Sequence, residues 1–396
     1  MTAQILGRSP NQAVIGSEVD KSFPNADGTY QTAEGSKIAQ GSDKVLVTVA
    51  GRDGLAPGMP FKIAIESCFT LGEELSPEET LKQLMTSEGY SAMCAQAGVS
   101  NDALTQSAVC GLLSTLNEAS DNVILAPLDR ANGKKVTSRE FGEILLKIRD
   151  FVSKTPTDKT LKAPSATEMS KAFSKLNSPK LIDHLGEDLG VVIESTAEQE
   201  AELCELIANA LHLDYPERND TLLCAVGYGR DQVVPAIATA KVVACVVTEN
   251  GPEMIYSLES DDPAVNGIPT RVTFPAQDSI LQAEVHGVSR EFAQEVVEVA
   301  VEGAEQVFSA KGKDLENYRS GLANIVNDWM EERTANFLRV FGAMGETAAA
   351  QTAELMVRMQ ELTAAMGDTQ ATCGGPVEVA TITKCNGIRW HRRYDS

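Results

Sequence analysis

Histidine is the residue type in this sequence best suited to acid–base and metal chemistry, because imidazole titrates near neutral pH and binds metals. The chain contains four histidines, which lie far apart: His184, His212, His286 and His391. Asp183 precedes His184, and Asp214 follows His212 at a spacing of two, so each pair places a carboxylate near an imidazole. No H-E-x-x-H, G-x-S-x-G or C-x-x-C motif accompanies them. We therefore predict no catalytic residue, no cofactor and no metal site, and the sequence favours a non-enzymatic protein.

Cys373 is the cysteine best placed for reactivity, because Gly374 and Gly375 beside it leave its sulfur accessible. His391 is the nearest base in the sequence. Three interpretations stay open: a nucleophilic thiol, a crosslink between Cys373 and Cys385, or an inert loop residue. Most of the eight cysteines lie in apolar segments, which is typical of buried thiols in a reducing compartment.

Composition limits the classes of protein that this chain can belong to. Hydrophobic residues at 43% and charged residues at 23% exclude disorder throughout, and 396 residues suffice for two or three domains. A formal net charge of -22 disfavours both nucleic acid and anionic membrane surfaces as partners. The sequence has no apolar window long enough to span a membrane and no signal-peptide pattern. We expect a protein that is cytoplasmic, or part of a particle assembled in the cytoplasm.

The predicted fold class is α+β, a mostly antiparallel sheet covered by helices, with a long C-terminal helical section and a terminal β-hairpin. Residues 1–42 contain few large apolar side chains and are predicted to form an extended polar arm, which lies on a neighbour or on its own domain. Residues 43–153 form an α+β domain in which capping boxes open helices at Ser76 and Thr137. Residues 154–219 form a linker and a helical segment, with another capping box at Ser195.

Residues 220–288 are rich in Val, Ile and Thr and predict an antiparallel sheet. Residues 289–369 predict long helices, and the first of them, through Phe292 and Val296, is expected to cover that sheet. Two narrow apolar rows follow at steps of three and four residues. The first row consists of Leu315, Tyr318, Leu322, Ile325 and Trp329, and the second of Leu355, Met359, Leu362 and Met366. Such rows must be buried, either in a hairpin within the chain or against another copy.

Residues 370–396 predict a basic C-terminal hairpin around the turn Asn386–Gly387. Arg389, Arg392 and Arg393 make this end cationic although the whole chain is acidic. The hairpin suits an acidic helix face at 198–205 or 291–305 of a neighbouring copy, or an acidic surface of its own chain. The sequence leaves both alternatives open.

These observations predict a non-enzymatic structural subunit of a large protein assembly, of virion type or similar. Its partners would be other copies of itself or other assembly subunits, joined through the arm, the two apolar rows and the basic hairpin. The alternative is an enzyme or small-molecule binding protein with a pocket between the 220–288 sheet and its covering helices.

Overall fold

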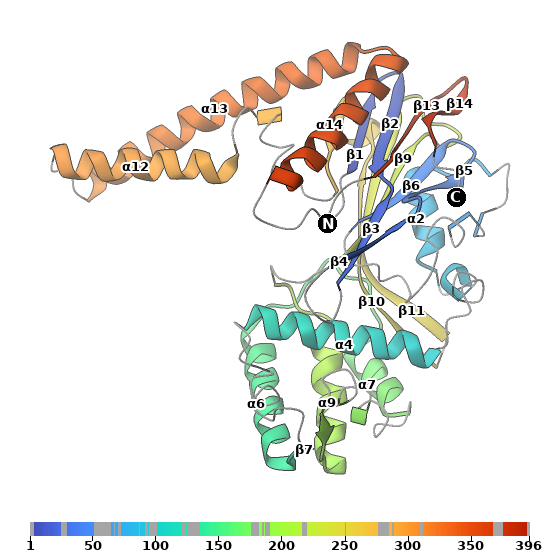
Figure 1. Cartoon of the computed structure of the whole chain (residues 1–396), viewed down its shortest axis with the longest axis vertical. Helices are drawn as coiled ribbons and strands as arrows, with labels where there is room; N and C mark the ends of the chain where they lie inside the picture. Colours follow the sequence, from blue (N-terminus) through green and yellow to red (C-terminus); the bar gives the residue numbers. More distant parts are fainter. Residues whose placement is uncertain are drawn as a thin grey trace.

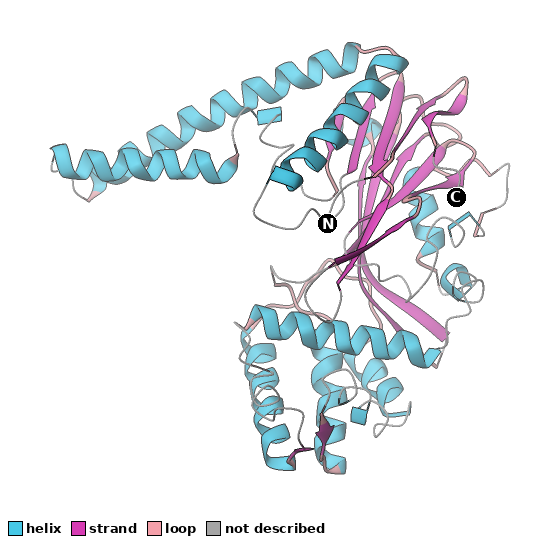
Figure 2. Cartoon of the chain, viewed as in Figure 1, coloured by secondary structure: helices cyan, strands magenta, loops and turns pink. Residues whose placement is uncertain are grey.

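Two antiparallel sheets of five strands lie at the centre of the computed structural model (Figure 2). The structure describes residues 4–24, 30–50, 65–66, 68–69, 73–86, 88–91, 94, 101–120, 124, 135–175, 182–183, 186, 191–215, 220–249, 251–275, 285–286, 289–308, 312–366 and 375–393. Cys373 and His184 therefore lie outside the described residues. The α+β fold, with its long helical section and terminal hairpin, agrees with the prediction.

Sheet I joins strands from both ends of the chain in the order β12–β1–β2–β13–β14. Its strands are β1 (Gln4–Ser9), β2 (Gln12–Glu18), β12 (Arg271–Thr273), β13 (Val377–Thr383) and β14 (Gly387–Arg392). Sheet II has the order β11–β10–β9–β6–β5. Its strands are β5 (Ile38–Ser42), β6 (Val45–Ala50), β9 (Thr221–Gly227), β10 (Ala236–Thr248) and β11 (Gly251–Asp261). A two-stranded ribbon of β3 (Asp20–Pro24) and β4 (Tyr30–Glu34) lies between β2 and β5 in the chain.

The two sheets pack face to face as a sandwich. Apolar side chains of both sheets, including Leu6, Ile15, Leu46 and Val226, meet between them. The outer face of sheet I is covered by α14 (Glu346–Met366) and the outer face of sheet II by α2 (Pro77–Leu84). Both faces of the central strands of each sheet are thus buried, so these strands need not alternate apolar and polar residues along their length.

Residues 4–18 correct the prediction of an extended polar arm. They form β1 and β2 near the middle of sheet I, and every residue of both strands is buried. The prediction was wrong because it rested on the polar content of this segment, and these polar side chains have partners inside the sandwich. Gln4, for example, donates from Nε2 to Val49 O at 2.5 Å. β2 pairs with β13, so a segment predicted to tether neighbours instead closes the chain's own sheet.

A cluster of helices lies below the sandwich (Figure 1). It consists of α4 (Asn101–Ala119), α6 (Ser138–Lys154), α7 (Ala166–Lys175) and α9 (Ala197–Ala210), with the short strands β7 (Lys135–Val136) and β8 (Val192–Ile193). Strand β10 extends into this cluster after an irregularity between Val242 and Ala244, and Ala244 and Val246 pack in its core. The helices on both sides of residue 154 therefore share one hydrophobic core.

Capping chemistry starts several of these helices where the sequence predicted it. The boxes at Ser76 and Thr137 are present, with each cap side chain accepting from the N3 backbone. The third box begins one residue later than predicted, at Thr196, and uses Gln199 at N3. A short helix, α10 (Pro263–Asn266), connects β11 to β12. None of the helices among the described residues has the length and apolar character needed to cross a membrane.

Helices α12 (Arg290–Phe308) and α13 (Lys313–Ala343) form a hairpin that projects from the sandwich (Figure 1). This arrangement corrects the expectation that the helix carrying Phe292 covers the sheet. The helix packs on α13 instead, through its small side chains Ala293, Val297, Val301 and Ala304. Phe292 is 55% exposed, so the larger side chains, which suggested the covering face, point outward.

Candidate functional site

The projecting hairpin is fixed to the body at the C-terminal end of α13. Phe341 is 1% exposed and packs against β1, where Gly7 provides the space for its ring. A Cβ atom at position 7 would lie only 2.5 Å from Cζ of Phe341. Phe337 stacks on Phe341 at 6.1 Å between ring centroids, and Gln12 Nε2 donates to Met344 O at 2.9 Å. The hairpin therefore projects from a well-packed base.

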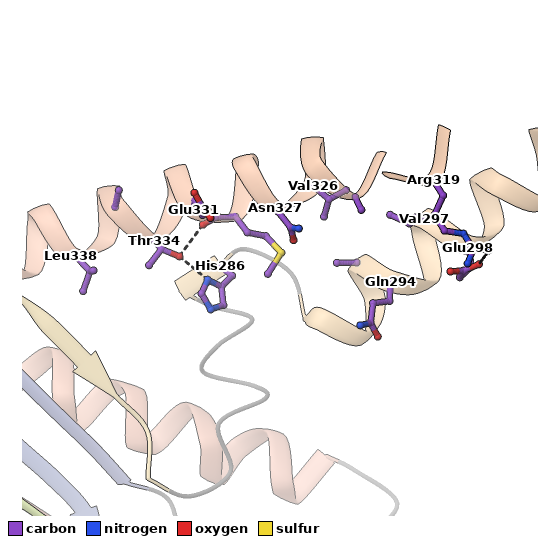
Figure 3. A pocket seen from close by; sticks show the side chains of 14 residues that line it. His286, Gln294, Val297, Glu298, Arg319, Val326, Asn327, Glu331, Thr334 and Leu338 are labelled. Carbon is purple, nitrogen blue, oxygen red and sulfur yellow. Dashed lines mark hydrogen bonds and ion pairs between the residues drawn. The ribbon is translucent and has the colours of Figure 1, made fainter. Parts of the chain in front are cut away.

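Between the two helices lies a groove with a volume of about 770 Å³ (Figure 3). At its end nearest the body, His286 Nδ1 lies 2.6 Å from Thr334 Oγ1. The Thr334 hydroxyl donates to Met330 O at 2.8 Å, so it accepts its other bond from Nδ1–H of His286. Towards the tip, Arg319 and Glu298 form an ion pair at 2.8 Å. The ion pair thus links α13 to α12, and the hydrogen bond of His286 links α13 to the segment that precedes α12.

The predicted row on α13 does not form the contact with α12. Ile325 is 66% exposed, and Tyr318 and Trp329 are also exposed, while Leu315 and Leu322 are half-buried. The contact uses the adjacent face of α13, where Met330 is buried and lines the groove. The hairpin predicted from sequence therefore forms, and yet it leaves Tyr318, Ile325 and Trp329 of this row exposed.

The second predicted row lies on the outer face of α14. Leu362 is 61% exposed, Leu355 is exposed to a similar degree, and Met359 is half-buried. The side chain of Met366 lies outside the described residues. The face that packs on sheet I consists of Ala349, Ala350, Ala353, Met356 and Val357. Gly16 of β2 lies beneath this face, and a Cβ placed there would be 3.5 Å from the side chains of Ala353 and Val357. The sequence signal that was missed is this spacing of small residues, which permits close helix–sheet packing.

The basic hairpin pairs with α14 of its own chain. Arg389 Nη1 lies 3.7 Å from Glu346, and Arg392 Nε lies 3.0 Å from Glu354. Arg393 stacks on Trp390 at 5.1 Å from the ring centroid. The arginine side chains of both ion pairs are more than half exposed, and exposed pairs contribute little free energy and exchange easily with other partners. The structure thus brings all three predicted arginines to one edge of the molecule.

His391 lies in a cluster that resembles a catalytic triad in composition but not in geometry. Its Nε2 lies 2.8 Å from Thr381 Oγ1, and that hydroxyl donates to Glu346 at 2.8 Å. Burial and the nearby Arg389 lower the pKa of His391. Thr381 is completely buried, and its proton is directed to a carboxylate and not to the imidazole. The cluster holds β13, β14 and α14 together and exposes no nucleophile.

A second set of buried polar groups lies within the sandwich, where Lys37 Nζ is 3.1 Å from Glu18 and Ser36 Oγ is 2.6 Å from Glu378. All four residues are buried, so no substrate reaches them. In the other predicted His–Asp pair, His212 is half-buried and Asp214 is exposed. Partial burial lowers the pKa of His212. Among the described residues, no group of three His, Cys, Asp or Glu side chains is arranged to hold a metal ion.

Neither a protein-family model nor a curated protein matches this chain. The geometry of the chain itself is therefore the basis for a functional assignment. The features that the fold leaves unexplained are the projecting hairpin, the exposed apolar side chains on α12, α13 and α14, and the basic edge at β14.

Proposed function

We propose that this chain is a non-enzymatic structural subunit of a large protein assembly, of virion type or similar. The observation that carries the proposal is the α12–α13 hairpin, which projects from the sandwich and exposes Phe292, Ile325 and Trp329 (Figure 1). Exposed apolar patches are characteristic of surfaces that bind other proteins, and both helices of this hairpin carry large exposed apolar side chains. The partners are further copies of this chain or other subunits of the same assembly.

The shape of the hairpin supports this role. A long helix pair with few contacts to the body contributes little to the core of a single copy, although α13 alone spans Lys313–Ala343. A helix with an uncovered apolar face is stabilised when a partner removes that face from water. At about 25 cal/mol per Å² of buried apolar area, a few such side chains contribute several kcal/mol to association. Aromatic residues such as Trp329 and Phe292 are typical anchors of interfaces.

The sheet of residues 220–288 offers less support for the alternative, an enzyme or small-molecule binding protein with a pocket on that sheet. Leu223 and Ala225 of β9 pack beneath α2, whereas Cys224 and Val226 face the other sheet. Both faces of this strand are filled by side chains. The groove described above lies in the hairpin, away from the predicted pocket.

Size-exclusion chromatography with light scattering tests the proposal. We expect the purified chain to give a mass above the 42.3 kDa of one copy, increasing with protein concentration. A variant carrying Ile325→Glu and Trp329→Glu should dissociate, because it places charges in the row that becomes buried. Val265→Glu, at an exposed site on α10, is the matched control and should leave the mass unchanged. A wild-type chain that stays at the mass of one copy at every concentration and salt level would refute the proposal.

A further inference from the structure

Helix α12 exposes two adjacent rows of different chemistry. Its apolar row consists of Phe292, Val296 and Val299, all of which are exposed. At 100° per residue, Glu295 and Glu302 lie directly beside this row, on the side away from the buried alanines and valines. Both carboxylates are exposed, and within the described part of the chain neither has an ion-pair partner, in contrast to Glu298. A partner for this surface must therefore be both cationic and able to cover apolar side chains.

The β13–β14 end of sheet I has this chemistry. Its edge strand carries Arg389 and Arg392, and Arg393 follows directly with its guanidinium over the ring of Trp390. Lys384, in the turn between the two strands, donates to the backbone carbonyl oxygens of residues 229, 230 and 232. These carbonyl oxygens are neutral, so they do not compensate the positive charge of Lys384. Arginine combines charge with a planar surface that stacks on apolar groups, which suits a mixed apolar and acidic partner.

The two surfaces lie at opposite edges of sheet I. The hairpin joins the body beside β1 and β12, where Gly342 of α13 approaches Thr270. Strand β14 is the last strand at the other edge, and Figure 1 shows the hairpin projecting away from it. The acidic helix therefore cannot reach the basic edge of its own copy. Contact between them requires a second copy.

We propose that α12 of one copy docks on the β13–β14 edge of the next copy, which deepens the proposed function and rests on it. The exposed ion pairs of Arg389 and Arg392 with α14 exchange for pairs with Glu295 and Glu302 of the neighbour. The apolar row of α12 covers the stacked Trp390 and Arg393. Because the two surfaces differ, the contact is heterologous, and repetition gives a closed ring or an open filament.

Charge reversal tests this pairing directly. The helix variant carries Glu295→Arg and Glu302→Arg, and the edge variant carries Arg389→Glu and Arg392→Glu. Each variant alone brings like charges together, so we expect the concentration at half-assembly to rise at least about tenfold. Mixed in equal amounts, the two variants pair opposite charges at every contact, and assembly should be restored. Light scattering gives the mass, and circular dichroism confirms that each variant is folded.

Glu198→Arg with Glu205→Arg is the matched control, since it reverses two exposed carboxylates on α9 and should leave assembly unchanged. If the wild type remains a single copy, the proposed function itself fails. If the wild type assembles but the helix and edge variants assemble equally well, only the head-to-tail contact is wrong. A mixture of the two variants that stays dissociated also excludes this pairing. So does a helix variant that does not assemble while the edge variant still assembles.

Discussion

Phe341 is the residue whose truncation most directly tests how the hairpin is held on the body. Its side chain is 1% exposed and lies between β1 and α14 in the core that covers sheet I. A phenylalanine buries about 150–250 Å², which at about 25 cal/mol per Å² amounts to roughly 4–6 kcal/mol. Alanine retains part of this area but leaves a cavity. We therefore expect Phe341→Ala to lower the free energy of unfolding by about 3–5 kcal/mol.

Phe292→Ala is the matched control, because it removes the same atoms from a side chain that is 55% exposed. Its cost should stay below about 1 kcal/mol. Urea unfolding of both variants is followed by circular dichroism and by the fluorescence of Trp329 and Trp390, at concentrations where the chain is a single copy. Equal effects of the two substitutions, or a loss below about 1 kcal/mol for Phe341→Ala, would show that the base of the hairpin is not packed as described.

Three further outcomes follow from the same structure. Gly7→Val should destabilise the chain by about 1–3 kcal/mol, because its Cβ would lie 2.5 Å from Phe341 Cζ. Combining it with Phe341→Leu should recover part of this loss in urea unfolding. If the free-energy losses of the two single variants simply add in the double variant, residues 7 and 341 are not in contact. Asp261→Ala should lower the free energy of unfolding by about 3–5 kcal/mol, because it removes the carboxylate that lies 2.6 Å from the completely buried Arg8 guanidinium. A decrease under about 1 kcal/mol in the same assay would refute this prediction. Burial lowers the pKa of His212, so the unfolded chain binds a proton at this imidazole more readily, and stability should fall as pH drops below about 6.5. The urea midpoint of His212→Gln should fall less between pH 7 and pH 5 than that of the wild type. Equal decreases for the two proteins would show that His212 does not contribute to the pH dependence of stability.

Local chemistry allowed parts of the fold to be predicted from sequence. The boxes at Ser76 and Thr137 involve side chains and backbone groups three residues apart, so the sequence contains both partners. The hairpin turn is similarly local. It comprises the three residues 384–386, and Gly387 directly after it adopts a positive φ of 68°, which three-residue hairpin loops favour. The antiparallel sheet and the long helices followed from apolar periodicity for the same reason.

Burial by distant segments decided the rest. Residues 4–18 looked like a polar arm because strands covered on both faces lose their alternation, and their polar side chains find partners only after β13, α14 and sheet II have assembled around them. The inward face of α14 packs over Gly16 of β2, more than 300 residues earlier in the chain, so no local pattern identifies that face. A sequence shows that Ile325 and Leu362 belong to apolar rows, but the tertiary structure decides which rows are covered, because smaller side chains on the neighbouring faces allow closer packing.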